Sequence, residues 1–187
     1  SGDTGKAALA GFADVPGTKI IVFYPKNGVS PIQEKQMVTQ KGANTFVVGI
    51  HGNFDDAQTG VKKMFGDKEL AAQMDKAGYQ FSSANSINIG RLVPQIVYYV
   101  YAYGQLLRQG ELKAGEKMNV VVPTGNFGNI LAAYYAKNMG IPIETLYCAS
   151  NENKVLFDFF QTGTYDRKRE FILTTSPSMD ILISSNL

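Results

Sequence analysis

The glycine-rich segment at residues 123–129 (PTGNFGN) has the residue types of an anion-binding loop. It follows the apolar run 119–122 directly and precedes a helical pattern over 129–138. Two glycines allow consecutive backbone N–H groups to turn toward one point, and a helix N-terminus adds a favourable dipole. Because the segment contains no lysine, the sequence predicts a site for a monophosphate held by backbone, Asn and Thr groups. A tight strand–helix turn with Asn129 as the N-cap is the alternative that the spacing leaves open.

A second anion-friendly turn is predicted at residues 1–5 (SGDTG), where a helical pattern begins. Thr4 can offer a hydroxyl group there, and the first turn of the helix offers backbone amides. The alternative is simple capping of the helix by Ser1 or Asp3.

The third polar cluster lies at residues 85–91 (NSINIGR), next to a long apolar helical pattern. Arg91 suits a bidentate contact with a phosphate or a carboxylate, and Asn85 and Ser86 lie close to it in the sequence. The alternative is a capped helix with an ion pair at its surface.

Composition and charge exclude several other kinds of function. His51 is the only histidine and Cys148 the only cysteine, so no zinc site of Cys and His ligands and no internal disulfide is expected. The net charge is +2 with the two signs interleaved, which argues against a nucleic-acid partner. The longest apolar stretch, near residues 92–104, is shorter than the roughly 20 residues of a membrane span. Without a signal peptide or glycosylation sequon, we expect a cytoplasmic location and no membrane partner.

Strand-like and helix-like patterns alternate along the chain, which predicts a parallel sheet that helices bury on both faces. Strands are expected at residues 19–24, 44–50, 119–122, 143–149 and 171–174. Helices are expected at 3–13, 30–42, 55–78 with a weak point at Gly66, 89–108, 129–138 and 153–160. Ser30, Pro31 and Gln33 predict a capping box at the start of the second helix. We expect a domain boundary near residues 82–87.

The helical pattern at 89–108 carries a group of tyrosines, Tyr98, Tyr99, Tyr101 and Tyr103. These side chains cover more than one face of the helix. The spacing therefore favours packing in a core over a platform on which nucleobases stack.

Taken together, these segments resemble threonine synthase. The resemblance rests on 125–129, on 1–5, on 85–88 followed by Arg91, and on the closing residues 176–181 (SPSMDI) and 184–186 (SSN). They occur in the order of the family and span essentially the whole chain. The resemblance implies an incomplete α/β fold with three-layer, open, mostly parallel sheets, the tryptophan-synthase-β-like fold (PLP fold type II). It also implies a smaller lobe at 1–83 and part of a larger, cofactor-phosphate-binding lobe at 84–187.

The same resemblance implies a lyase of threonine biosynthesis that uses pyridoxal 5'-phosphate. Such an enzyme converts O-phosphohomoserine, a small-molecule substrate, and water to L-threonine and phosphate. The cofactor-binding residues implied are Gly125, Asn126, Phe127, Gly128, Asn129 and, toward the ring hydroxyl, Asp3. The residues implied to grip the substrate phosphate are Thr4, Asn85, Ser86 and Arg91, and no metal ligand is implied.

The lysine that carries the cofactor in this family lies in a Phe-Lys-Asp context, which has no match here. Lys6 follows the SGDTG turn instead of preceding it, so the catalytic lysine is expected upstream of Ser1. The family's later Ser or Thr that contacts the pyridine nitrogen is expected beyond Leu187. We therefore predict that the 187-residue chain has no catalytic residue and no activity alone, and that exposed sheet edges favour self-association.

Two other functions stay open at this point. A different enzyme of the same cofactor fold, such as a threonine dehydratase or cysteine synthase, usually has Ser-x-Gly-Asn-His at the first turn. Asp3, Thr4 and Phe127 speak against that assignment. A non-catalytic module that binds a phosphate-bearing ligand is compatible with the missing lysine.

Overall fold

The computed structural model describes residues 2–187, so the predicted capping by Ser1 lies outside the described residues. The chain divides into two compact units, Ser1–Ala84 and Asn85–Leu187. The predicted boundary after Ser83 lies one residue before this division. The assignment of the units as lobes of a larger enzyme stays a prediction.

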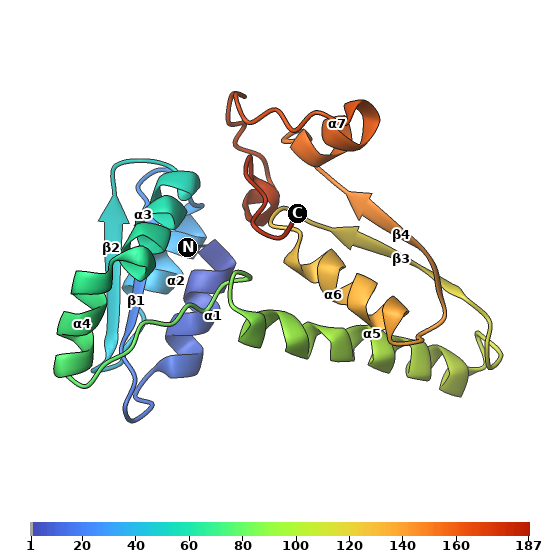
Figure 1. Cartoon of the computed structure of the whole chain (residues 1–187), viewed down its shortest axis with the longest axis horizontal. Coiled ribbons are helices and arrows are strands. Elements are labelled where there is room, and N and C mark those ends of the chain that lie inside the picture. The colour runs from blue at the N-terminus through green and yellow to red at the C-terminus, as the bar shows by residue number, and fades with distance from the viewer. Residues whose placement is uncertain (1) are drawn as a thin grey trace. The chain divides into compact units, whose positions relative to one another are not determined.

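The first unit is a small α/β layer structure around two parallel strands (Figure 1). Its elements are α1 (Gly2–Phe12), β1 (Ile20–Pro25), α2 (Pro31–Val38), β2 (Thr45–Ile50), α3 (Phe54–Gly66) and α4 (Lys68–Lys76). In the ladder, Ile20 lies opposite Thr45 and Pro25 lies opposite Ile50. One face of the sheet is buried with α1 and α2, in a core of Leu9, Val22, Tyr24 and Met37. Helix α3 also contacts β1 and lies in front of the sheet in Figure 1.

Local capping explains where two helices of this unit begin. The predicted capping box is confirmed, because the Ser30 hydroxyl accepts from the Gln33 N–H and the Gln33 side chain accepts from the Ser30 N–H. The helical stretch predicted over 55–78, with a weak point at Gly66, is two helices that meet at that point. Asp67 is extended (φ −82°, ψ 104°) and its carboxylate caps α4, so the backbone leaves one helix and enters another.

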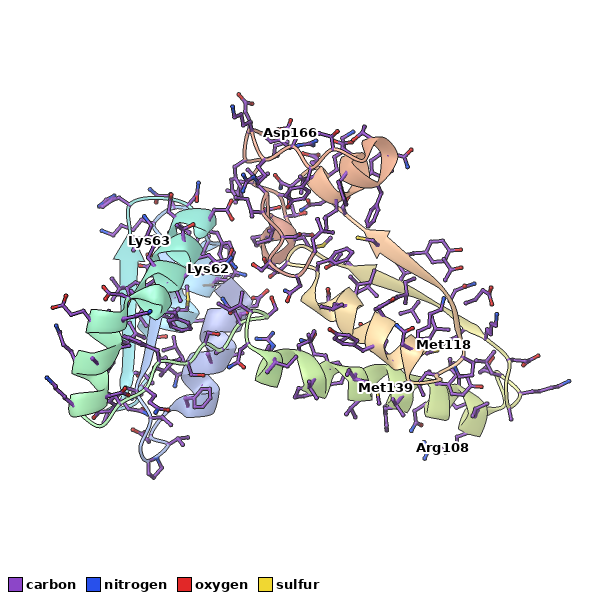
Figure 2. All side chains as sticks on the ribbon, in the orientation of Figure 1. Lys62, Lys63, Arg108, Met118, Met139 and Asp166 are labelled. Atoms are coloured by element: carbon purple, nitrogen blue, oxygen red, sulfur yellow. The ribbon has the colours of Figure 1, made fainter. Side chains whose placement is uncertain are left out.

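The second unit has the same alternation of strands and helices. Its elements are α5 (Ile89–Gln109), β3 (Met118–Pro123), α6 (Gly128–Asn138), β4 (Ile143–Ala149), α7 (Val155–Thr162) and the 3₁₀ turn η1 (Pro177–Met179). Strands β3 and β4 are parallel, with Met118 opposite Ile143 and Pro123 opposite Ala149. Helices α5 and α6 pack together on one face of this sheet, where Tyr103, Met118, Ala136 and Ile143 form the core (Met118 is labelled in Figure 2).

The other face of the second sheet differs from the expectation of burial on both sides. Val121 is 64% exposed and Tyr147, opposite it in the ladder, is 51% exposed. Among the described residues, no helix covers these two side chains. The prediction that the α5 tyrosines pack is confirmed for Tyr103, whereas Tyr98 and Tyr101 are exposed.

The prediction of a strand at residues 171–174 is wrong, although each of these residues is apolar or β-branched. The backbone N–H of Ile172 donates to Asn153 Oδ1 at 3.0 Å, and Asn153 Nδ2 donates to the Ile172 carbonyl at 2.7 Å. A side-chain amide therefore supplies the two hydrogen bonds that a neighbouring strand would otherwise make. Within residues 2–187, no helix is long and apolar enough to cross a membrane.

Candidate functional site

The predicted anion loop joins β3 to α6 and is held together by Asn129. The Asn129 side-chain oxygen accepts from the Thr124 hydroxyl at 2.7 Å and from the Ile130 N–H at 2.9 Å. Its amide group donates to the Pro123 carbonyl at 2.8 Å. The alternative that made Asn129 the N-cap is therefore wrong. The N-cap is Phe127, which has a left-handed backbone (φ 66°) and no capping side-chain bond.

The loop presents a row of backbone donors. Within residues 2–187, none of the N–H groups of residues 125–129 donates to another backbone or side-chain atom. Three of these groups precede α6 and those of Gly128 and Asn129 lie in its first turn, so the dipole of the helix favours negative charge beside them. A buried or half-buried amide without an acceptor costs free energy, and an anion would supply the acceptor.

The closing segment of the chain, residues 181–186, contacts the carbonyl side of the loop. Ser184 Oγ donates to the Gly125 carbonyl, and Asn186 Nδ2 donates to the Asn126 carbonyl at 2.9 Å. A trans peptide carries its C=O and its N–H on opposite sides, and no peptide bond in the described chain is cis. Anchoring these carbonyls therefore turns the N–H groups of Asn126 and Phe127 to the opposite side.

Both glycines of the loop are needed for close approach. A Cβ on Gly125 would lie 2.7 Å from Ile181 Cγ1, and a Cβ on Gly128 would lie 2.7 Å from Ser86 Cβ. Side chains almost never approach that closely, so neither position accommodates a larger residue without movement. The glycine spacing seen in the sequence thus reflects packing against the segments on either side of the loop.

The structure brings Ser86 from the third polar cluster onto the anion loop. Besides its contact with Gly128, the Ser86 hydroxyl accepts from Asn186 Nδ2 at 3.1 Å. Asn85 uses its side-chain oxygen in a local turn, accepting from the Ile87 N–H at 3.3 Å. Arg91 lies in the first turn of α5 and is exposed.

Asp3 and Thr4 lie in the first unit, in the first turn of α1. The Asp3 carboxylate accepts from Gln33 Nε2 at 2.9 Å, which links the start of α1 to the capping box of α2. Gly5 follows them at a tight contact, because a Cβ there would lie 2.7 Å from Val22 Cγ1. The Lys6 ammonium donates to Gln40 Oε1, so it serves a local contact on the same unit.

The hydroxyl of Tyr99 forms a hydrogen bond with the backbone at the end of the loop. Tyr99 of α5 donates to the Asn129 carbonyl at 2.8 Å, and burial raises the pKa of the Tyr99 hydroxyl. This phenol therefore stays protonated near neutral pH and keeps donating. Among the described residues, no group of three or more His, Cys, Asp or Glu side chains is placed to hold a metal ion.

Sequence reasoning assigned residues 184–186 to a family pattern but gave them no structural role. Ser184, Ser185 and Asn186 all contact the loop, the second through a 3.3 Å bond from its hydroxyl to Asn126 Oδ1. Their run of small polar side chains was the one available signal. The sequence predicted Thr124 as a group that holds the phosphate, but Thr124 is only 4% exposed and its hydroxyl donates to Asn129 inside the loop.

Comparison with known proteins identifies relatives along the whole chain, although no protein-family model matches it. Threonine synthase-like 1 of Homo sapiens is 49% identical over all of this chain, which covers 26% of that protein. Threonine synthase of Saccharomyces cerevisiae is 44% identical over all of this chain, which covers 35% of it. The chain thus spans about a quarter to a third of the length of these curated relatives.

Solved structures agree with the sequence comparison. The crystal structure of threonine synthase from Escherichia coli matches 99% of this chain with a TM-score of 0.85 and 38% identity, over 40% of that chain. The structure of pyridoxal-phosphate-bound threonine synthase from Brucella melitensis matches 99% of this chain with a TM-score of 0.78 and 43% identity, over 38% of that chain. The predicted fold class, α/β with parallel strands and incomplete, is confirmed: the chain has the fold of the corresponding part of these enzymes.

Proposed function

Since this chain is homologous to threonine synthases along its whole length, we propose that it forms the phosphate-binding part of a pyridoxal-phosphate-dependent lyase. One observation carries the proposal. The loop at residues 125–129 presents five backbone N–H groups without an internal acceptor, and its carbonyl side is occupied by residues 181–186. A phosphate monoester is the ligand whose oxygens match a row of amides at a helix N-terminus.

The residues present fit the phosphate end of this cofactor. Gly125 and Gly128 keep the backbone close to its neighbours, and Phe127 takes the left-handed backbone conformation that precedes α6. Asn126 adds a side-chain amide, and Asn129 contributes its backbone N–H while its side chain holds the loop together. When bound, pyridoxal phosphate supplies an electron sink for proton transfers at the substrate carbons. The part of this chain is to hold the phosphate and so to orient the ring. A contact of Asp3 with the ring hydroxyl belongs to the same proposal.

The proposed substrate of the whole enzyme is O-phosphohomoserine, which reacts with water to give L-threonine and phosphate. Thr4, Asn85, Ser86 and Arg91 are proposed to bind the substrate phosphate. What supports this is the chemistry of the donors: two hydroxyls, an amide and a guanidinium that is exposed at the start of α5. In the full-length enzyme, Arg91→Ala should weaken substrate binding while the absorption spectrum of the bound cofactor stays normal.

The cofactor-phosphate site can be tested on this chain without covalent chemistry. Pyridoxine 5'-phosphate and pyridoxine both lack the aldehyde, so neither reacts with surface lysines. We expect the phosphorylated compound to shift the amide NMR resonances of residues 125–129 and to bind at least about tenfold more tightly than pyridoxine, as one or more charge-assisted bonds are added. Asn126→Ala should weaken the binding of pyridoxine 5'-phosphate and leave the binding of pyridoxine unchanged. Equal affinities, or shifts confined to other residues, would overturn the proposal.

The 187-residue chain alone is proposed to be inactive, because it contains no match to the family's Phe-Lys-Asp segment. Without a lysine that carries the cofactor, the covalent step has no nucleophile. Phosphate release from O-phosphohomoserine, assayed with the purified chain and added pyridoxal phosphate, should equal the rate with the cofactor alone. Turnover above that background would contradict this part of the proposal. The cytoplasmic location and self-association stay predictions.

A further inference from the structure

Asp180 is a buried carboxylate that lies outside every proposed binding residue. Only 3% of it is exposed. Its Oδ1 accepts from Asn151 Nδ2 at 2.7 Å, from Asn153 Nδ2 at 2.9 Å and from the Thr174 hydroxyl at 2.8 Å. Its Oδ2 accepts from the Thr174 N–H at 2.9 Å. Since a carboxylate only accepts, these four donors match it and would not match an amide.

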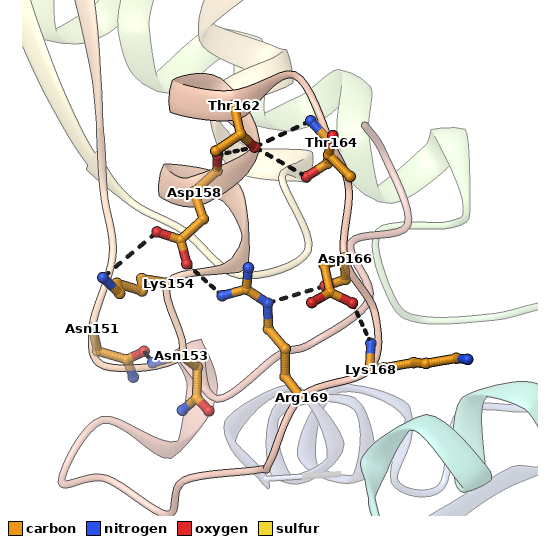
Figure 3. Close-up of polar contacts among 9 residues, drawn as sticks. All are labelled: Asn151, Asn153, Lys154, Asp158, Thr162, Thr164, Asp166, Lys168 and Arg169. Carbon is orange, nitrogen blue, oxygen red and sulfur yellow. Dashed lines mark hydrogen bonds and ion pairs between the residues drawn. The ribbon is translucent and has the colours of Figure 1, made fainter.

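This cluster ties the closing segment to the end of β4. Asn151 and Asn153 follow β4, and they lie together in the turn that leads to α7 (Figure 3). Asn153 is itself 7% exposed and grips both backbone groups of Ile172. Residues 172–174 and Asp180 are therefore joined through side-chain hydrogen bonds to the turn that follows β4.

The position of Asp180 sets the register of the residues that follow it. Ile181 packs directly on Gly125, because a Cβ added to Gly125 would lie 2.7 Å from Ile181 Cγ1. Tyr165 then receives the Ser184 N–H at 2.8 Å and donates to the Leu182 carbonyl at 3.2 Å. Ser184 and Asn186 in turn hold the carbonyls of the anion loop. Hydrogen bonds weaken steeply with distance and angle, so a small shift of Asp180 would loosen these contacts.

We propose that Asp180 is a positioning residue for the anion loop: it fixes the closing segment, which holds the carbonyls of Gly125 and Asn126 and so presents the amides of Asn126 and Phe127 to the ligand phosphate. This inference rests on the proposed function for the identity of the ligand. The change in loop geometry, however, is independent of any ligand. The hydrogen bonds of the Asp180 carboxylate go to Asn151, Asn153 and Thr174, so in this arrangement Asp180 acts on the loop through residues 181–186.

The test is Asp180→Asn, which keeps the shape but turns an NH₂ group toward one of the four donors. In the ligand-free chain, we expect the amide resonances of Asn126 and Phe127 to move while those of β4 stay in place. The dissociation constant of pyridoxine 5'-phosphate should rise about tenfold, the effect of one unmatched buried polar group, and that of pyridoxine should not change. Asp166→Asn is the control, because Asp166 is exposed and its carboxylate accepts from the Lys168 N–H in a local turn (Figure 3). The bond from Arg169 Nε goes to the backbone carbonyl of Asp166, which the substitution leaves in place.

A second variant guards against unfolding of the closing segment. Ser184→Ala leaves the Asp180 cluster intact and removes only the donor to the Gly125 carbonyl. It should therefore shift the same amide resonances and raise the dissociation constant of pyridoxine 5'-phosphate, but by less than Asp180→Asn does. A folded Asp180→Asn chain with unchanged loop resonances and unchanged affinity for pyridoxine 5'-phosphate would overturn the inference. If the unaltered chain fails to distinguish the two compounds, the proposed function fails. The ligand-free resonances then still decide whether Asp180 positions the loop.

Discussion

Gly128→Ala is the substitution for which the structure makes the sharpest prediction. The new methyl group would lie 2.7 Å from Ser86 Cβ and 3.3 Å from Asn186 Nδ2. Carbon atoms attract one another at about 3.5–4.0 Å, so the first contact is repulsive. The neighbour is the stem of a short side chain, which cannot swing away, and the backbone of residues 85–87 must move. Overpacking of this kind costs about 1–3 kcal/mol.

Urea unfolding followed by tyrosine fluorescence measures this cost in the relevant unit, because only Tyr24 and Tyr79 of the ten tyrosines lie in the first unit. With a slope of about 1–3 kcal/mol per molar urea, the midpoint should fall by roughly 1 M. Gly104→Ala is the matched control. A Cβ on Gly104 meets nothing within 4 Å in the middle of α5, so that alanine should raise stability by about 0.5–1 kcal/mol.

The two glycines are therefore predicted to respond with opposite signs to the same chemical change. Ser86→Gly removes the clashing atom, so the double variant Ser86→Gly/Gly128→Ala should lose less stability than the two single losses added together. If Gly128→Ala were as stable as the unaltered chain, the close packing of Ser86 on the loop would be refuted. The account of why the loop needs glycine at that position would then fail with it.

Three further predictions address other contacts. Ser30→Ala removes the capping oxygen of α2 and should cost about 1 kcal/mol, seen as faster amide exchange at Gln33; unchanged exchange would contradict the capping box. Asn129→Ala leaves the buried Thr124 hydroxyl without its acceptor and should cost about 1–3 kcal/mol in urea, whereas Asn138→Ala, at the exposed end of the same helix, should cost little. The hydrogen bond from Arg169, with Lys154 nearby, holds the pKa of the Asp158 carboxyl below its usual value near 4 (Figure 3). The contact therefore stabilises the folded chain fully at pH values above that usual pKa, and this stabilisation is lost as the pH falls through the lowered pKa. An NMR titration of Asp158 should show the low pKa, and Arg169→Gln should raise it; no rise would argue against the ion pair.

Features that depend on near neighbours in the sequence were predictable. The capping box needs only Ser30 and Gln33, and the four main strands follow from short apolar runs. The anion loop was located because its glycines stand between such a run and a helical pattern. Residues 171–174 failed by the same criterion. Their composition favours a strand, but the side chain of Asn153, nineteen residues away, occupies the hydrogen-bonding edge.

By itself the sequence determined the order of strands and helices, the position of the anion loop and the family resemblance, because each depends on the local residue pattern. Only the tertiary structure decided which way the loop faces. That orientation comes from Asn186, which reaches Asn126 across 60 positions and Ser86 across 100. It also comes from Asp180, whose partners lie up to 29 positions away. Such contacts leave no periodicity in the sequence, since each is a single hydrogen bond between segments that only the fold brings together.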